Sequence, residues 1–165
     1  MDGEVSVRRT TQRPGNVRLA TTADEDALFE FLMLAAEENA LSPPNDEVVL
    51  TVIRKATQRE GNVVGIIDAP DGTIAGSVGI CMNTWWYTLK WHCQDMWCFV
   101  HPDYRRGQQT YARDLIQFAK WWADQLGMDL IMGVMSLHRA EGKVRLYRRI
   151  LPFVGAVFLH RGGAA

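Results

Sequence analysis

The stretch FVHPDYRRGQQTYARDLIQFAKWWAD, residues 99–124, passes from an apolar strand through a turn into a helix. The helix is predicted because apolar side chains recur at helical spacing, at Leu115, Phe118, Ala119, Trp122 and Leu126. A helix that begins after such a turn leaves its first backbone N–H groups free and points the positive end of its dipole at the turn. Arg105 and Arg106 add guanidinium groups that suit phosphate oxygens, and Gly107 lets the backbone approach closely. These residues leave two interpretations open, a diphosphate site and an ordinary loop with two solvated arginines.

The composition indicates one globular domain without a polyanionic partner. The 165 residues are 47% hydrophobic and 22% charged, and 18 basic against 19 acidic side chains give a net charge of -1. This balance gives no reason to expect binding to nucleic acid or to an acidic membrane surface. The patterns G-x-x-x-x-G-K-[ST] and G-x-G-x-x-G are both absent, which argues against a nucleotide hydrolase and a dinucleotide-binding site. We expect a loose tail at residues 1–15 and a single domain at residues 16–165.

Cysteine usage and the lack of long apolar runs favour a cytoplasmic protein. Cys81, Cys93 and Cys98 are odd in number and lack C-x-x-C spacing, so neither a disulfide framework nor a metal site is predicted. No apolar run approaches the roughly 20 residues of a membrane span, and the polar start lacks the apolar core of a signal peptide. We therefore expect reduced thiols, a cytoplasmic location and no membrane partner.

The hydrophobic period predicts strands and helices in a defined order. A strand at residues 17–21 is followed by a helix with Thr22 as its N-cap and Glu25 three residues later, as in a capping box. A second helix is predicted from Asp46 because apolar side chains again recur at helical spacing. Residues 70–72, Pro-Asp-Gly, then mark the turn of a hairpin between two β-rich runs.

The second half of the chain continues this order. A β-rich run at residues 86–100 leads into the stretch quoted above. After the helix, the segments MDLIMGVM, GKVRLYRRI and FVGAVFLHR indicate a strand, a helix and a last strand. The whole order predicts one α/β (α+β) domain in which helices cover a mixed, mostly antiparallel sheet.

The segments VHPDYRR and GQQTYA, with the helix that follows them, resemble the cofactor-binding region of the GCN5-related N-acetyltransferases. In that family a strand ends in V-x-P-x-x-R, and a Q/R-x-x-G-x-G/A loop then binds the pyrophosphate of acetyl coenzyme A before an amphipathic helix. The resemblance covers the element order over most of the chain, and it includes LYRR at residues 146–149. It is nearest to divergent members found in bacteriophage genomes. It implies about six to seven strands flanked by about four helices.

The resemblance implies an acyltransferase that moves an acetyl group from its cosubstrate, acetyl coenzyme A, to a primary amine by direct attack in a ternary complex. It implies a cofactor-binding segment that consists of Phe99, Val100, Arg105, Arg106, Gly107, Gln108, Gln109, Thr110, Tyr111 and Ala112. A backbone N–H at Phe99 or Val100 would hold the thioester carbonyl. Tyr147 aligns with the family's acid for the leaving thiolate, and Asp95 lies where relatives carry a carboxylate that acts as a base through water.

The sequence also departs from the family pattern inside the loop. Thr110 stands in place of a glycine, and the two arginines lie upstream of their usual place. Two other functions therefore stay open, a noncatalytic acyl-coenzyme-binding module and a phage or host protein-interaction domain without a cofactor. The aromatic run TWWYTLKWHCQDMW suits an acceptor pocket, a cation–π site or a homodimer interface. The acceptor that the resemblance implies is a small-molecule or peptide amine, and these residues do not choose between the two.

Overall fold

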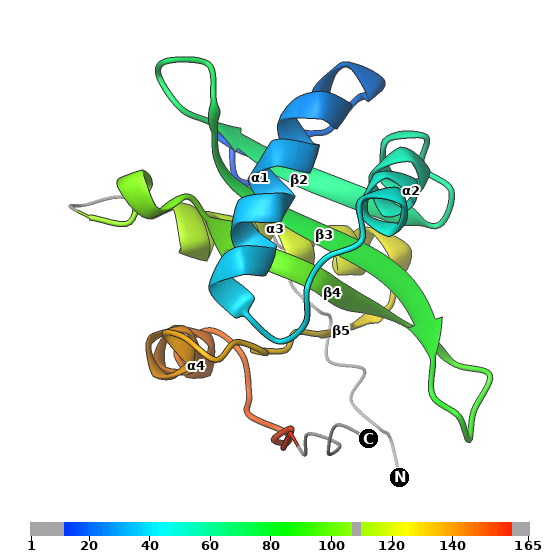
Figure 1. Ribbon diagram of the computed structural model, residues 1–165. Helices are drawn as coiled ribbons and strands as arrows, with labels where there is room; N and C mark the ends of the chain where they lie inside the picture. The colour runs from blue at the N-terminus through cyan, green and yellow to red at the C-terminus, as the bar shows by residue number, and fades with distance from the viewer. Residues whose placement is uncertain (1–11, 107–109, 160–165) are drawn as a thin grey trace, which may run out of the picture.

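Five strands in the order β1-β2-β3-β4-β5 make one mixed sheet in the computed structural model, which describes residues 12–106 and 110–159 (Figure 1). The strands span Arg18–Leu19 (β1), Asn62–Asp68 (β2), Ile74–Thr84 (β3), Trp91–Val100 (β4) and Asp129–Ile131 (β5). The first four strands pair antiparallel, whereas β5 runs parallel to β4. The predicted α+β architecture is confirmed, with five strands instead of the expected six to seven.

In the described part of the chain, four α-helices flank the sheet, and they span Glu25–Asn39 (α1), Asp46–Thr57 (α2), Tyr111–Leu126 (α3) and Ala140–Arg148 (α4). Two short 3-10 helices precede α1 and follow β4, at Thr22–Asp24 (η1) and Pro102–Tyr104 (η2). Figure 1 shows α1 and α2 on one face of the sheet and α3 on the other, with α4 beyond β5. No helix among the described residues is long and apolar enough to cross a membrane.

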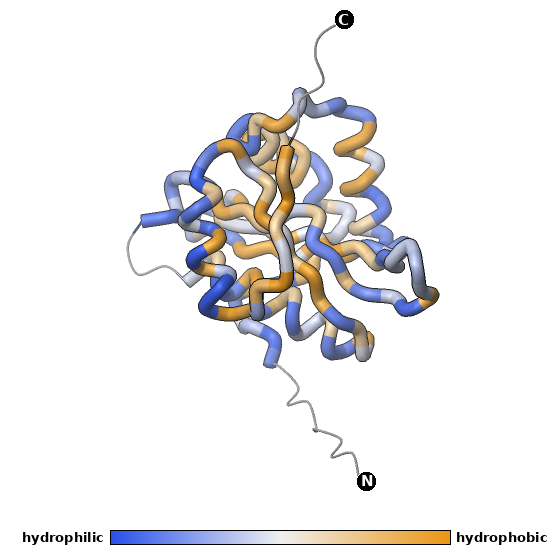
Figure 2. Tube along the Cα trace, turned by 90° about the horizontal axis from the view of Figure 1, so that it is seen from below, coloured by the Kyte–Doolittle hydropathy of each residue, from blue (hydrophilic) through white to orange (hydrophobic). Residues whose placement is uncertain are grey.

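The core has two layers because side chains of a strand alternate between the faces of the sheet. On β2, Val63 and Ile67 pack toward α3, while Val64 and Ile66 pack toward α1 and α2. Figure 2 shows hydrophobic stretches of chain inside the fold and hydrophilic ones at its margins. Gly65, between Val64 and Ile66 on β2, leaves room for α3, since a Cβ there would lie 2.7 Å from the ring of Phe118.

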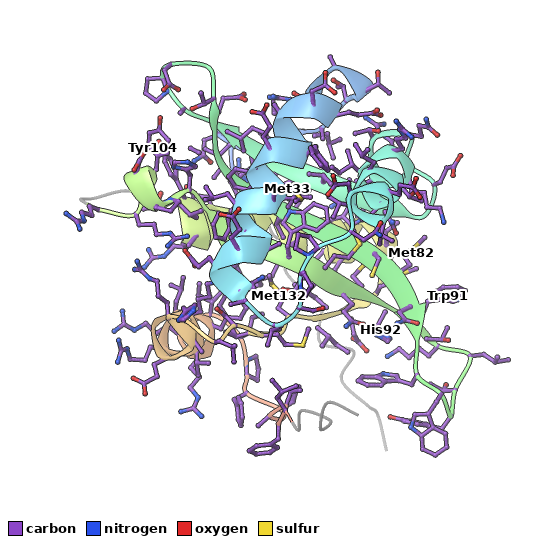
Figure 3. All side chains as sticks on the ribbon, in the orientation of Figure 1. Met33, Met82, Trp91, His92, Tyr104 and Met132 are labelled. Atoms are coloured by element: carbon purple, nitrogen blue, oxygen red, sulfur yellow. The ribbon has the colours of Figure 1, made fainter. Side chains whose placement is uncertain are left out.

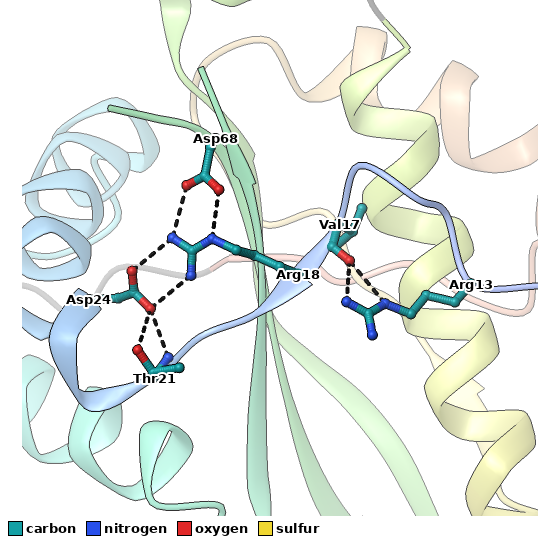
Figure 4. Close-up of polar contacts among 6 residues, drawn as sticks. All are labelled: Arg13, Val17, Arg18, Thr21, Asp24 and Asp68. Atoms are coloured by element: carbon teal, nitrogen blue, oxygen red, sulfur yellow. Dashed lines mark hydrogen bonds and ion pairs between the residues drawn. The ribbon is translucent and has the colours of Figure 1, made fainter. Parts of the chain in front are cut away.

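An arginine on β1 fixes where the first helix begins (Figure 4). The guanidinium of Arg18 bonds the carboxylates of Asp68 at 2.6 Å and of Asp24 at 2.8 Å. The Asp24 carboxylate also accepts the Thr21 amide at 2.8 Å, and the Arg18 hydrogen bond lowers the pKa of Asp24 to about 2. The helical cap is therefore Thr21 with Asp24, so the prediction of Thr22 with Glu25 was wrong by one residue.

Other element boundaries follow the predicted turn chemistry with two exceptions. The β2–β3 hairpin turns at residues 70–72, where Gly72 has a φ of 86°, and α3 ends at Gly127 with a φ of 63°. In contrast, the β-rich run begins its strand only at Trp91, because residues 85–90 form the connection between β3 and β4. The last strand was predicted at residues 153–161. Residues 153–159 have no regular secondary structure, and residues 160–161 lie outside the described residues.

A β-bulge in β4 places the residues of the site. Trp97 pairs with Gly79 and Asp95 pairs with Ile80, so Met96 is an extra residue between two register pairs. The bulge reverses the alternation of side chains, because Cys93 packs with α3 whereas Trp97, four residues later, packs with α1 and α2. Trp97 lies across Gly79 and donates its Nε1–H to Ser77 Oγ at 3.1 Å.

Candidate functional site

Strand β5 pairs with only the first half of β4. Only residues 92–94 of β4 pair with β5, at Asp129–Ile131. Beyond them, β4 continues to Val100 with no strand partner on that side among the described residues. The edge of β4 that is left open carries backbone groups that a ligand can reach.

The amide of Val100 faces this open side. The His101 amide donates to the carbonyl of Ala75 on β3 at 2.8 Å. Antiparallel pairing turns alternate amides toward the neighbouring strand, so the register that turns His101 toward β3 turns Val100 away from it. The Phe99 amide then faces β3, and the Phe99 side chain is buried against Phe31 with ring centroids 5.3 Å apart. Of the two amides predicted to hold a thioester carbonyl, this geometry favours Val100.

Asp95 bridges the two strands where they separate. Its Oδ1 accepts the amide of Gly133, which follows β5, at 2.9 Å. Burial raises the pKa of Asp95 from 3.8 to about 6, and the hydrogen bond from Gly133 opposes only part of this effect. A carboxyl group with a pKa near neutrality can accept and release a proton under physiological conditions.

Tyr147 of α4 lies against the Cys98 thiol of β4. The two groups interact closely enough for each to shift the pKa of the other. Burial raises the pKa of Cys98 to about 12, and burial with the neighbouring Cys98 and Asp95 raises the pKa of Tyr147 well above its ordinary value. Tyr147 is therefore protonated at neutral pH, as a proton donor must be, and the two predicted catalytic residues act on each other electrostatically.

A cavity of about 250 Å³ lies between the end of β4, the start of α3 and the inner face of α4. Its lining consists of Cys98, Val100, Arg105, Ala112, Arg139, Gly142, Lys143, Leu146 and Tyr147. Three of these residues are cationic and none is acidic. The cavity thus combines an apolar wall with positive charge, which fits an elongated ligand that has an apolar arm and an anionic end.

Arg105 has partners within the protein. Its Nη1 lies 2.6 Å from a Glu38 oxygen, its Nε donates to the Val100 carbonyl at 2.7 Å, and its guanidinium stacks 4.9 Å from the Phe99 ring centroid. Lys143 Nζ lies 3.8 Å from the other Glu38 oxygen and 5.8 Å from the same ring centroid. These contacts join α1, β4 and α4 at the edge of the cavity, and the role of Arg105 as a phosphate ligand stays a prediction.

The remaining residues of the predicted cofactor segment differ in their surroundings. Arg106 is exposed, and Gly107, Gln108 and Gln109 lie outside the described residues. Thr110 is the N-cap of α3, but its hydroxyl donates to the Asp114 carboxylate at 2.7 Å instead of capping a backbone amide. Tyr111 packs at the margin of the core, and Ala112 lines the cavity. The start of α3 therefore faces the cavity with the small side chain of Ala112.

Sequence reasoning missed Lys143, Glu38 and Cys98 as parts of this site. Lys143 precedes Tyr147 by four residues, so one face of a helix carries both, and this spacing was available from the sequence. Glu38 gave no such signal, because it meets Arg105 only through the packing of α1 on the sheet.

Solved structures share this fold over most of the chain. A predicted acetyltransferase from Clostridium acetobutylicum with acetyl-CoA has a TM-score of 0.71 at 13% identity, with 89% of this chain and 95% of that chain covered. A ribosomal-protein-alanine N-acetyltransferase from Brucella melitensis biovar Abortus 2308 has a TM-score of 0.66 at 19% identity, with 89% and 98% covered. AAC(6')-Iy in complex with the bisubstrate analogue CoA-S-monomethyl-acetylneamine has a TM-score of 0.67 at 15% identity, with 90% and 97% covered. No protein-family model matches the sequence, and no curated protein matches it.

The chain has the fold of the GCN5-related N-acetyltransferases, as the VHPDYRR segment predicted. At identities of 13–19%, these three likenesses concern the fold alone. What the site does must be derived from the chain's own residues.

Proposed function

We propose that the protein transfers an acetyl group from acetyl coenzyme A to a primary amine by direct attack in a ternary complex. The observation that carries this proposal is the cavity beside the open edge of β4, where Tyr147, the Val100 amide and three cationic side chains meet. Two proteins of the same fold contain acetyl-CoA or a coenzyme A analogue in their structures, which supports the choice of cosubstrate.

Residues around the cavity suit the parts of this cosubstrate. The diphosphate would lie against the start of α3, where Ala112 leaves the backbone accessible and Arg139 and Lys143 supply positive charge from α4. The pantetheine arm carries amides and methylene groups, so it would lie along the open edge of β4, as an added strand does. The other predicted ligands, Phe99 and residues 105–111, belong to the same proposal.

Asp95 and Tyr147 would carry out the proton transfers. With its pKa near 6, Asp95 would take a proton from the ammonium of the acceptor, through water, and so free the nitrogen lone pair. The nitrogen would attack the thioester carbonyl, whose oxygen the Val100 amide would stabilise as it gains negative charge. When the carbon–sulfur bond breaks, Tyr147 would give its proton to the thiolate. The tyrosinate would then recover a proton from the nitrogen, which becomes the neutral amide. The Tyr147 hydroxyl already interacts with a sulfur atom, that of Cys98.

The test is release of free coenzyme A thiol from acetyl coenzyme A in the presence of a panel of amines, with mass spectrometry of the acceptor. The panel should include small polyamines, aminoglycosides and peptides with a free N-terminus, since neighbours of this fold include an N-acetyltransferase for a ribosomal protein and one in complex with an acetylneamine analogue. Amine-dependent thiol release with an acetylated product would support the proposal. Binding of acetyl coenzyme A without turnover of any amine would favour the noncatalytic binding module instead.

A further inference from the structure

The connection between β3 and β4 carries an exposed group of large apolar side chains at one end of the molecule. We call this surface the aromatic tip, and it consists of Trp85, Trp86, Tyr87, Leu89 and Trp91. Trp86 is 94% exposed and Leu89 is 93% exposed. The hairpin projects from the body of the fold in Figure 1, and Figure 3 places Trp91 at its root. Nothing in the proposed chemistry uses these residues.

The aromatic tip is built on a buried anchor. The Trp85 ring stacks on His92, which is 4% exposed, with centroids 4.8 Å apart, and on Tyr87 with centroids 6.2 Å apart. Trp86 packs edge-on against Tyr87 with centroids 5.3 Å apart. At the base of the hairpin, Lys90 Nζ lies 2.6 Å from an Asp129 oxygen. Rings held in this way lose little conformational entropy when a partner covers them.

The apolar area of the aromatic tip matches one side of a protein interface. A buried aromatic side chain contributes about 150–250 Å², so the exposed parts of these side chains amount to on the order of 600 Å². Single apolar patches on monomeric proteins are commonly about 300–600 Å², and larger ones mark interaction sites. A standard interface buries about 800 Å² per partner. The aromatic tip therefore supplies most of the area that a stable contact needs.

Charge distinguishes between the partners that such a surface fits. Lys90 is the only charged residue among residues 84–91, and Asp129 neutralises it. The tip thus lacks the excess of basic side chains that draws proteins to anionic lipid. Stacked and edge-on rings are complementary to other rings, and a surface that complements itself forms a two-fold symmetric contact.

We propose that the aromatic tip is a homodimer interface, in which the tips of two copies pack on each other around a two-fold axis, with Trp86 and Leu89 at its centre. The tip lies at the start of β4, while the cavity lies at its end. Ten residues of strand span about 33 Å, so the dimer leaves the cavity open on both copies. This inference is independent of the acetyl-transfer proposal.

The experiment is sedimentation velocity of the full chain over the low to high micromolar range, on the wild type and on a Trp86→Ser/Leu89→Ser variant. The matched control is Val48→Ser, which removes a side chain that is 61% exposed on α2, away from the tip. We expect dimers for the wild type and the control, and monomers with an unchanged circular dichroism spectrum and melting temperature for the tip variant.

Three results would overturn the proposal. The first is a wild type that stays monomeric throughout the concentration range. The second is a folded tip variant that dimerises as the wild type does, since the interface would then lie elsewhere. The third is a monomeric wild type that co-sediments with phosphatidylserine vesicles through the tip, which would make lipid the partner.

Discussion

The carboxylate of Asp95 accepts the backbone amide of Gly133 at 2.9 Å, across the gap where β4 and β5 separate. This bond holds an ionisable group at the inner end of the open strand edge, and burial there raises its pKa to about 6. One contact thus links the two strands at the point of separation and keeps an ionisable carboxyl group within the site. We therefore expect substitution of Asp95 to change activity and stability in ways that can be measured separately.

The pH dependence of activity should report Asp95. We expect kcat/KM to fall about tenfold per pH unit below pH 6, because the base is then protonated. Asp95→Asn, which keeps an oxygen that can accept the Gly133 amide, should lower kcat about 100-fold at pH 7.5 and remove this acidic limb. An unchanged profile for the variant would assign the base to another group.

The Asp95→Asn variant, although less active, should be more stable than the wild type at high pH. The folded chain holds the Asp95 proton more tightly than the unfolded chain, so the stabilisation from this group is complete below pH 3.8 and is lost as pH rises through about 6. Asp95→Asn should therefore raise the free energy of unfolding at pH 8 by about 1–2 kcal/mol and change it little at pH 4. Urea denaturation at both pH values measures this difference. A variant that is less stable at pH 8 would mean that the ionised carboxylate is favourable there.

Tyr147→Phe should remove a proton donor and keep the ring. We expect kcat to fall about 100-fold with the Kd of acetyl coenzyme A unchanged, as measured by thiol release and by calorimetry. Tyr104→Phe is the control, because Tyr104 bonds Asp71 at 3.2 Å outside the cavity and should leave kcat as it is. Equal activity in both variants would remove the acid assignment from Tyr147.

Glu38 and Arg105 should be energetically coupled in their contributions to the free energy of unfolding. Both side chains are about 15% exposed, so removal of one leaves a largely buried charge without its partner. We expect Arg105→Ala to cost about 2 kcal/mol, with a coupling energy of about 1–2 kcal/mol in the double-mutant cycle with Glu38→Ala. The more exposed pair of Lys90 and Asp129 is the comparison, and its coupling should stay below about 1 kcal/mol. Equal coupling in the two cycles would contradict this reading of the site.

Gly79→Ala should destabilise the bulge of β4. The added Cβ would lie 2.5 Å from the Trp97 ring, and moving the ring breaks its hydrogen bond to Ser77. We expect a loss of about 2 kcal/mol, measured by urea denaturation. Gly15→Ala places its Cβ in open space and should change stability by less than about 0.5 kcal/mol. A Gly79→Ala variant as stable as that control would mean that Trp97 moves freely.

More of the fold than of the site could be predicted from the sequence. Strand and helix periods, the turn at Gly72 and the stop at Gly127 are local signals, so the structure follows them closely. The last strand was predicted from an apolar run alone, and residues 153–159 form none, because an apolar run does not specify which strand it would pair with. The cap shifted by one residue because Arg18 binds Asp24 from another strand, which no local pattern records.

For the site, the sequence found residues on single elements and missed contacts between elements. Asp95 and Tyr147 were predicted by position, and the structure brings them close enough to shift the pKa of Tyr147. Arg105 was predicted from its local motif as a phosphate ligand, but its partner Glu38 comes from α1, 67 positions earlier in the chain. The β4 bulge also turns side chains to the opposite face from the one that simple alternation predicts.

Acetyl coenzyme A binding tests the central claim most directly. The measurement is isothermal titration calorimetry of acetyl coenzyme A into the wild type, into Lys143→Glu within the cavity, and into the exposed control Lys55→Glu on α2. We predict micromolar binding to the wild type and to Lys55→Glu, and binding at least tenfold weaker to Lys143→Glu. No binding to the wild type, or equal binding to the two charge-reversed variants, would contradict the assignment of this cavity to the cosubstrate.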